Sequence, residues 1–151
     1  MTRSVLDTNI LVRAAITPLG AVAPVILRLR NGKFTLLYSQ ALLNELIKVL
    51  EYPHIQRKYD IDAEAIQNFV GVLVQYGERV EPNRTVNVCR DPDDNHVIEV
   101  ALAGNAEYVV SNDQDLLVLK EYETVRFVTV GEFLRILDAQ PSQSELSEQS
   151  E

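Results

Sequence analysis

The sequence predicts an α/β fold in which a parallel β-sheet is covered by helices on both faces. Short apolar runs alternate with amphipathic helical patterns, and the connections between them carry no hairpin signals. Parallel strands need such helical crossovers, and their sheets are usually buried on both faces. The chain has 151 residues, of which 46% are hydrophobic, which suits one compact domain with a sizeable core. We therefore expect a single domain over residues 1–138.

The first half of the chain predicts strands and helices in alternation. Residues 4–6 form a short apolar run, which a polar turn and a helical period follow. A second helix is expected to end at the pair Asn31-Gly32, a common helix C-terminal signal. Residues 34–38 form the second strand candidate, and Ser39 is placed to cap the helix that follows.

The second half continues the alternation. Pro53 interrupts the helical pattern, and Asp62 starts another helix that stops at Gly77. The remaining predicted elements are a brief strand over 79–81, a helix over 91–105, a strand over 108–111, a short helix ending near 119, a strand over 126–129 and a helix over 130–138.

Composition excludes several classes of protein. The net charge of −8 argues against a generally basic nucleic-acid binder. Three of the acids lie in residues 139–151, a polar segment that we expect to be an acidic, disordered tail. No apolar run is long enough for a membrane span, and no signal peptide follows Met1. Cys89 is the single cysteine, so no internal disulfide forms, and we expect a cytoplasmic protein.

Three carboxylates crowd into the stretch from Asp91 to Asp94, just ahead of a helical pattern. One interpretation is helix-start chemistry, with Asp91 as the N-cap and Pro92 in the first helical position. In that register Asp94 shares a helix face with three apolar residues, Val97, Ile98 and Ala101. A carboxylate on a buried face is costly unless a partner compensates its charge.

Other acids are expected at the same edge of the sheet. Asp7 follows the first strand and Asp113 follows the strand 108–111, and ligands of parallel sheets bind at the carboxyl ends of strands. Glu45 lies at the border of the apolar face of its helix. The alternatives are a cap or turn role for Asp7 and Asp113, and a salt bridge to Lys48 for Glu45.

Converging carboxylates need protons or cations, because two charges about 4 Å apart repel by roughly 4 kcal/mol at an effective dielectric near 20. All-oxygen ligands favour Mg²⁺ or Mn²⁺ over zinc, and such an ion suits phosphodiester hydrolysis. His96 is left out of the site, because it should point about 100° away from Asp94. Residues that could orient ligands or water, or else serve as caps, are Thr8, Asn9, Ser39, Asp91, Asp93, Ser111 and Asp115.

These motifs, in this order, resemble the PIN domain family, and most closely its prokaryotic toxin components of toxin–antitoxin systems. The motifs are Asp7-Thr8-Asn9, Ser39 with Glu45, Asp91 to Asn95 with Ala101, and Ser111-Asn112-Asp113. The resemblance covers about residues 2–137. It implies a three-layer fold with a five-stranded parallel sheet of order 3-2-1-4-5.

The resemblance also implies an activity. It implies a Mg²⁺- or Mn²⁺-dependent ribonuclease that cleaves single-stranded RNA, with Asp7, Glu45, Asp94 and Asp113 as catalytic metal ligands. A homodimer and a small antitoxin partner are expected as well. Two other functions compete with this one. A non-catalytic PIN-fold module that binds RNA or protein would not need the four acids, and a phospho-acceptor domain would need a different acid pattern after the first strand.

Overall fold

A six-stranded, mostly parallel sheet forms the centre of the molecule in a computed structural model that describes residues 1–140. The strand order is β3-β2-β1-β4-β6-β5, and every pairing is parallel except that of β5 with β6. The strands are β1 (Arg3–Leu6), β2 (Thr35–Tyr38), β3 (Gly77–Arg79), β4 (Tyr108–Val110), β5 (Glu121–Tyr122) and β6 (Val125–Val128).

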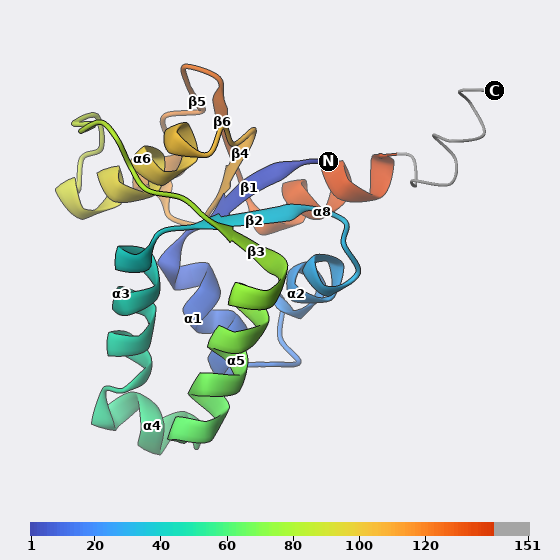
Figure 1. Ribbon diagram of the computed structural model, residues 1–151, viewed down its shortest axis with the longest axis vertical. Coiled ribbons are helices and arrows are strands. Elements are labelled where there is room, and N and C mark those ends of the chain that lie inside the picture. The colour runs from blue at the N-terminus through green and yellow to red at the C-terminus, as the bar shows by residue number, and fades with distance from the viewer. Residues whose placement is uncertain (141–151) are drawn as a thin grey trace.

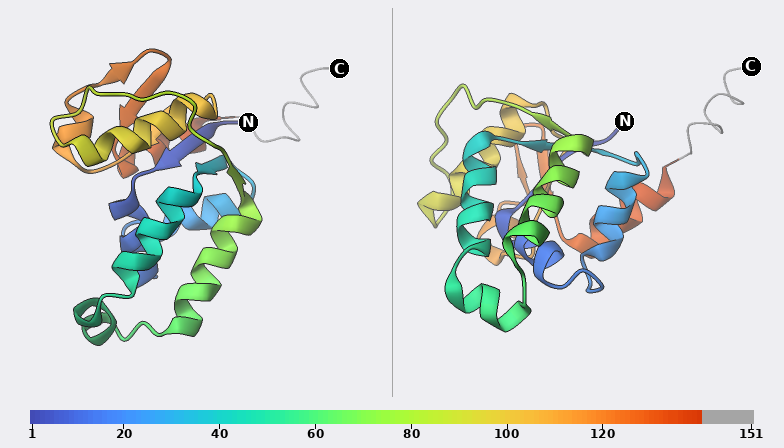
Figure 2. Two further views of the ribbon diagram at one scale, coloured as in Figure 1. Left: turned by 60° about the vertical axis from the view of Figure 1, so that its left-hand side comes forward. Right: turned by 60° about the horizontal axis from the view of Figure 1, so that its bottom comes forward.

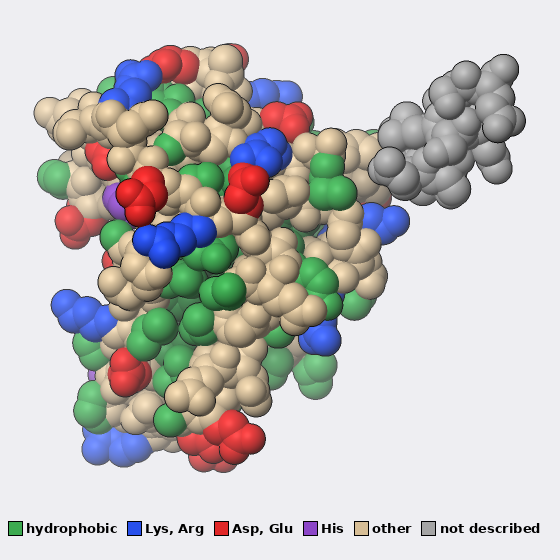
Figure 3. Space-filling view, viewed as in Figure 1, with side chains coloured by type: hydrophobic (Ala, Val, Ile, Leu, Met, Phe, Trp, Pro, Cys, Tyr) green, Lys and Arg blue, Asp and Glu red, His purple; other side chains and the backbone are tan. Residues whose placement is uncertain are grey.

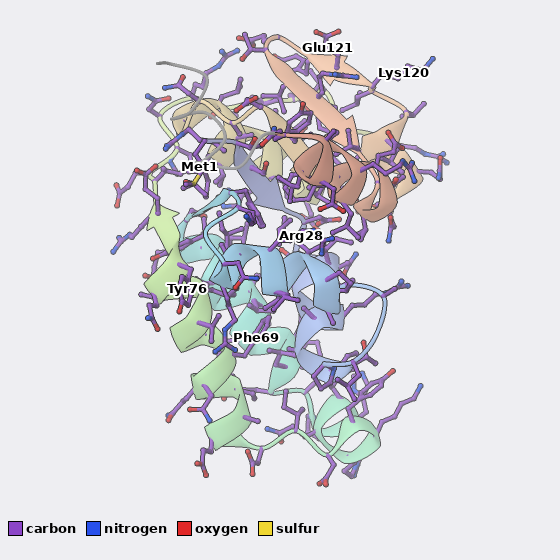
Figure 4. The ribbon with its side chains drawn as sticks, turned by 90° about the vertical axis from the view of Figure 1, so that its right-hand side faces the viewer. Met1, Arg28, Phe69, Tyr76, Lys120 and Glu121 are labelled. Carbon is purple, nitrogen blue, oxygen red and sulfur yellow. The ribbon has the colours of Figure 1, made fainter. Side chains whose placement is uncertain are left out.

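The parallel part of the sheet confirms the expected order, since its five strands follow the sequence as 3-2-1-4-5. The sixth strand, β5, was not predicted. It pairs with β6 through a tight hairpin in which Glu123 has a φ of 53°. Hairpin turns of this kind usually carry Gly, Asn or Asp at positive φ, so a glutamate gave no turn signal. Lys120 and Glu121 lie at this outer edge of the sheet (Figure 4).

Helices lie on both sides of the sheet and make three layers (Figures 1 and 2). Helix α6 packs on β1, β2 and β4 from one side, while α5 packs on β2 and β3 with α1, α2 and α3 on the other. The helices are α1 (Thr8–Ile16), α2 (Ala23–Arg30), α3 (Gln40–Leu50), α4 (Pro53–Tyr59), α5 (Ala63–Tyr76), the 3₁₀ turn η1 (Pro92–Asp94), α6 (Asn95–Ala103), α7 (Gln114–Leu117) and α8 (Val130–Ala139).

Side-chain caps begin several of these helices. The Ser39 hydroxyl accepts a hydrogen bond from the Leu42 amide at 3.1 Å, and the Asp62 carboxylate accepts one from the Ala65 amide at 2.8 Å. Each cap is worth about 1 kcal/mol. Both caps confirm the predicted helix starts. The predicted strand over 79–81 lies two residues earlier, as β3, because Leu36 of β2 pairs with Gly77.

The core is one continuous apolar cluster between the sheet and its helices. Phe34 at the start of β2 meets Phe133 of α8 edge to face, with ring centroids 5.0 Å apart. Such aromatic pairs contribute about 0.5–1.5 kcal/mol beyond their burial. Arg28 of α2 forms an ion pair with Asp138 of α8, which fixes these two helices side by side (Figure 4).

Helix α4 occupies the region after Pro53, where the sequence indicated only an interruption. Pro53 is the first residue of α4, and Asp60 ends it with a positive φ of 51°. The helix joins α3 to α5 at the end of the molecule farthest from the sheet (Figure 1). A groove of about 590 Å³ lies between these helices, with Ile47 and Val70 in its lining. Hydrophobic side chains are visible along this face (Figure 3).

The described structure continues to residue 140, two residues past the expected end of the domain at residue 138. Ala139 is the last residue of α8, and the side-chain amide of Gln140 donates a hydrogen bond from Nε2 to the Thr2 hydroxyl at 2.7 Å. The rest of the predicted acidic tail, residues 141–151, lies outside the described residues. Within residues 1–140, no helix has the length and apolar character needed to cross a membrane.

Candidate metal centre

Asp7 lies at the carboxyl end of β1, with only 5% of its surface exposed. Its amide continues the sheet by donating to the Val110 carbonyl of β4 at 3.0 Å. The Ser111 hydroxyl donates to Asp7 Oδ2 at 2.9 Å and accepts from the Asp113 amide at 2.9 Å. One buried serine therefore ties the acid after β1 to the acid after β4. This juxtaposition agrees with the prediction that both acids meet at one edge of the sheet.

Asp94 enters the same edge from the opposite layer. Asp91 caps the turn η1 by accepting from the Asp93 amide at 3.1 Å, and Asp94 stands where η1 passes into α6. Its predicted face is the buried one, because Val97 is 5% exposed while Ile98 and Ala101 are fully buried. Asp91 was expected to cap an α-helix, but it caps a single 3₁₀ turn.

Three carboxylates approach closely enough to share one cation. Asp94, Asp113 and Asp115 each place an oxygen within 4.8 Å of the others. Asp113 caps α7 by accepting from the Asp115 amide at 2.9 Å, so the cap and the first turn of α7 supply two of the three oxygens. Asp115 was expected only as an outer neighbour, and its spacing of two residues from Asp113 is the sequence signal for its place here.

The acids influence one another electrostatically. Burial raises the pKa of Asp94 to about 7, with further contributions from Asp113 and Asp7. Burial also raises the pKa of Asp7, although the hydrogen bond from Ser111 opposes this shift. The buried thiol of Cys89 has its pKa raised to about 11 by burial and then by nearby carboxylates, Asp94 first among them. The edge thus concentrates negative charge on one buried and three partly buried carboxylates.

One oxygen of this group is left without a partner. Asp94 Oδ2 is buried and has no hydrogen-bond donor within residues 1–140. A buried anionic oxygen without a donor costs several kcal/mol, unless a proton or a cation compensates it. The all-oxygen donor set, with one oxygen still unsatisfied, fits Mg²⁺ or Mn²⁺.

Glu45 is not brought into this group. It lies on α3 with an exposed side chain, outside the set of carboxylates within 4.8 Å of one another. Asp7 also lies outside that set, but it is coupled to Asp94 and Asp113 through charge and through Ser111. Glu45 forms no ion pair with Lys48 within the described residues.

The remaining predicted neighbours have mixed positions. Thr8 is buried beside Asp7, whereas Asn9 and Asp93 are exposed. Ser39 caps α3 and also lies 2.8 Å from His96 Nε2. The His96 ring therefore faces the start of α3. No sequence signal predicted this contact, because it depends on how α6 packs relative to α3.

Asn95 is a further residue that sequence reasoning did not assign. It is 5% exposed, and its Oδ1 accepts hydrogen bonds from the amides of Val88 and Cys89 at 3.0 and 2.9 Å. The segment ahead of η1 is thereby fixed to the turn that presents Asp94. This segment runs back along α6, where the Val86 amide donates to Glu99 at 2.9 Å (Figure 2).

Comparisons with known proteins agree with this architecture. The model of the PIN domain matches residues 3–115. An uncharacterized protein of Methanocaldococcus jannaschii is 30% identical over 117 residues, which are 78% of this chain and 74% of that protein. The fold is similar to that in the crystal structure of VapBC2 from Rickettsia felis bound to a DNA fragment from their promoter, with a TM-score of 0.56 and 16% identity over 85% of this chain and 98% of that chain. The match covers more than half of the chain, with strands β1 to β4 and all the acids of the site, and shows that this chain belongs to the PIN domain family.

Proposed function

We propose that this protein is a metal-dependent endoribonuclease that hydrolyses phosphodiester bonds in single-stranded RNA. The observation that carries the proposal is the buried Asp94 Oδ2, which has no hydrogen-bond partner among the described residues and lies beside Asp113 and Asp115 at the carboxyl edge of the sheet. Membership of the PIN domain family and the intact set of acids support it.

Asp94, Asp113 and Asp115 would hold a Mg²⁺ or Mn²⁺ ion, and Asp7, which Ser111 links to Asp113, would be a further ligand. A divalent cation supplies Lewis-acid activation of water and neutralises charge at the phosphate. The chain's own part is to orient the ligands. Ser111 fixes the Asp7 carboxylate and the Asp113 amide with one hydroxyl, and Asp91 fixes the turn that carries Asp94. Glu45, the remaining member of the predicted set of four acids, stays in this proposal as a ligand that reaches the metal from α3 when substrate and metal are bound.

The test is cleavage of a panel of single-stranded and structured RNAs by the purified full chain with Mn²⁺, with Mg²⁺ and with EDTA. We expect cleavage of the single-stranded RNAs only when metal is present. The comparison protein is the double variant Asp7→Asn/Asp94→Asn, with its fold checked by circular dichroism. Equal behaviour of the two proteins would refute the nuclease and favour the non-catalytic PIN-fold module.

We also propose that the enzyme is the toxin of a toxin–antitoxin pair and acts as a homodimer. The fold similarity to VapBC2 supports this role. A small open reading frame abutting this one should encode a protein that co-purifies with the chain and suppresses its RNA cleavage. Sedimentation of the chain alone tests the homodimer, and a purely monomeric species would contradict it.

A further inference from the structure

A side pocket of about 580 Å³ borders the metal centre. The segment ahead of η1 forms one wall with Asn87, Val88 and Arg90, and the other wall carries Gln114 of α7 and Val118 just beyond it. The volume falls in the range of about 300–1,000 Å³ that small-molecule sites occupy. The pocket is therefore large enough for a ligand of nucleotide size.

The pocket and the metal centre share a residue. Asp115 lines the pocket and also belongs to the group of three carboxylates. A phosphate bound at that group would place the base attached to the same nucleotide within reach of the pocket.

The lining offers the contacts that an unpaired base needs. Asn87, Gln114 and Arg90 have exposed side chains, and none of them is engaged by a hydrogen bond or an ion pair from within residues 1–140. Side-chain amides can donate and accept at once, which suits the edge of a base. Val88 and Val118 are 38% and 68% exposed, which leaves apolar surface for the flat face of the base.

Single strands favour this kind of recognition. In single-stranded RNA the bases are free to be splayed into pockets and bonded along their edges, whereas a duplex hides them. The guanidinium of Arg90 supplies a cation for a backbone phosphate on a molecule whose net charge is −8.

We propose that the side pocket binds the base next to the cleaved phosphate and sets the cleavage preference of the enzyme. Gln114 and Asn87 contact the edge of the base, Val88 and Val118 cover its face, and Arg90 pairs with the adjoining phosphate. The position of the cleaved bond rests on the proposed nuclease function, but nucleotide binding by the pocket does not.

The binding test is therefore made without cleavage. AMP, CMP, GMP and UMP are titrated in turn into the full chain with Mg²⁺, and the methyl signals of Val88 and Val118 are followed by NMR. We expect one nucleotide to shift these signals at the lowest concentration, and Gln114→Ala to weaken that binding. The pocket is refuted if all four leave these methyl groups unmoved.

The cleavage test uses a single-stranded RNA library with Mn²⁺, with cut sites read by sequencing. We expect a base preference beside the cut, and Gln114→Ala or Asn87→Ala should reduce it by about tenfold, the order expected for one lost base-edge contact. Arg90→Ala should raise KM more than it lowers kcat. The matched control is Gln67→Ala, an exposed glutamine on α5, which should keep the preference.

The two proposals can fail separately. If nucleotides shift the valine signals but no RNA is cut, the nuclease fails and the pocket stands. If RNA is cut with a preference that the Gln114 and Asn87 substitutions leave intact, the nuclease stands and the pocket is refuted.

Discussion

The two sides of the metal centre are built differently. On the strand side, Asp7 and Asp113 are joined through the buried hydroxyl of Ser111, so their positions are set by the sheet itself. On the helix side, Asp94 is carried by a single capped turn, and its buried Oδ2 has no donor among the described residues. On the strand side the hydrogen bonds of Ser111 satisfy the polar groups, whereas on the helix side Asp94 Oδ2 needs a proton or a cation to compensate its charge. We therefore expect Asp94 to be the proposed ligand whose loss matters most.

The largest effect is therefore expected for Asp94→Asn. Removing this charge should lower Mn²⁺-dependent RNA cleavage by more than about 100-fold, beyond the range of about 10- to 100-fold typical of residues that only support a ligand. Cleavage rates with and without EDTA measure the loss. The matched control is Asp93→Asn, which removes the same charge one residue away from an exposed side chain. An equal loss in the control would mean that cleavage depends on the total negative charge of this turn and not on the buried position of Asp94 Oδ2.

Ser111→Ala tests the strand side. The change leaves Asp7 Oδ2 and the Asp113 amide without their shared partner, and we expect a loss of about 2–4 kcal/mol in the free energy of unfolding. Urea denaturation measures it. Ser4→Ala is the control, because Ser4 is equally buried but its hydroxyl has no partner within residues 1–140. This control should be neutral or slightly stabilising, and a similar loss in both variants would contradict the role given to Ser111.

The pH dependence of stability separates the charge of Asp94 from its packing. Its pKa in the folded chain is raised from 3.8 to about 7, so the folded state binds this proton more tightly than the unfolded state does. The contribution of this proton to the free energy of unfolding is therefore fully present below about pH 4 and is lost as the pH rises through 7.

In EDTA, Asp94→Asn should gain stability over the unsubstituted chain by about 1–2 kcal/mol between pH 4.5 and pH 8, after allowance for partial exposure. Paired urea titrations across this range provide the measurement. Added Mn²⁺ should reverse the order at pH 8, because the ion binds the folded chain through Asp94. A stability difference between the two proteins that does not change with pH would show that Asp94 has the same pKa in the folded and unfolded states, which contradicts the prediction.

The smallest effect is expected for Glu45→Gln. Its exposed side chain lies outside the close group of acids and would reach the metal only in the loaded complex, so cleavage should fall by about tenfold, the lower end of the range for residues that support a metal site. Glu51→Gln, at the exposed C-cap of the same helix, is the control. A loss no larger than that of the control would contradict a role for Glu45 as a ligand.

The sequence predicted those features that follow from local periodicity. The burial of Val97, Ile98 and Ala101 placed Asp94 on an inward face, and the strand ends placed Asp7 and Asp113 at one edge. Glu45 shows the limit of this reasoning, because a helical period locates the border of an apolar face but not which side of that border a long side chain takes. The contact of Ser39 with His96 depends on packing between segments 57 residues apart, which no local pattern encodes. The strand β5 was missed for a local reason, because Glu123 occupies the turn of its hairpin without the usual turn residues.

The hydrogen bonds of Asn95 have a consequence for how this enzyme could diversify. Asn95 Oδ1 connects the segment that forms one wall of the side pocket to the same turn that presents Asp94. This oxygen accepts hydrogen bonds from the backbone amides of Val88 and Cys89, so the connection does not depend on which side chains the wall carries. Residues such as Asn87 and Arg90 can therefore be exchanged while the acids keep their positions. Under the two proposals above, base preference and metal binding would therefore be set by different side chains of one short stretch of chain.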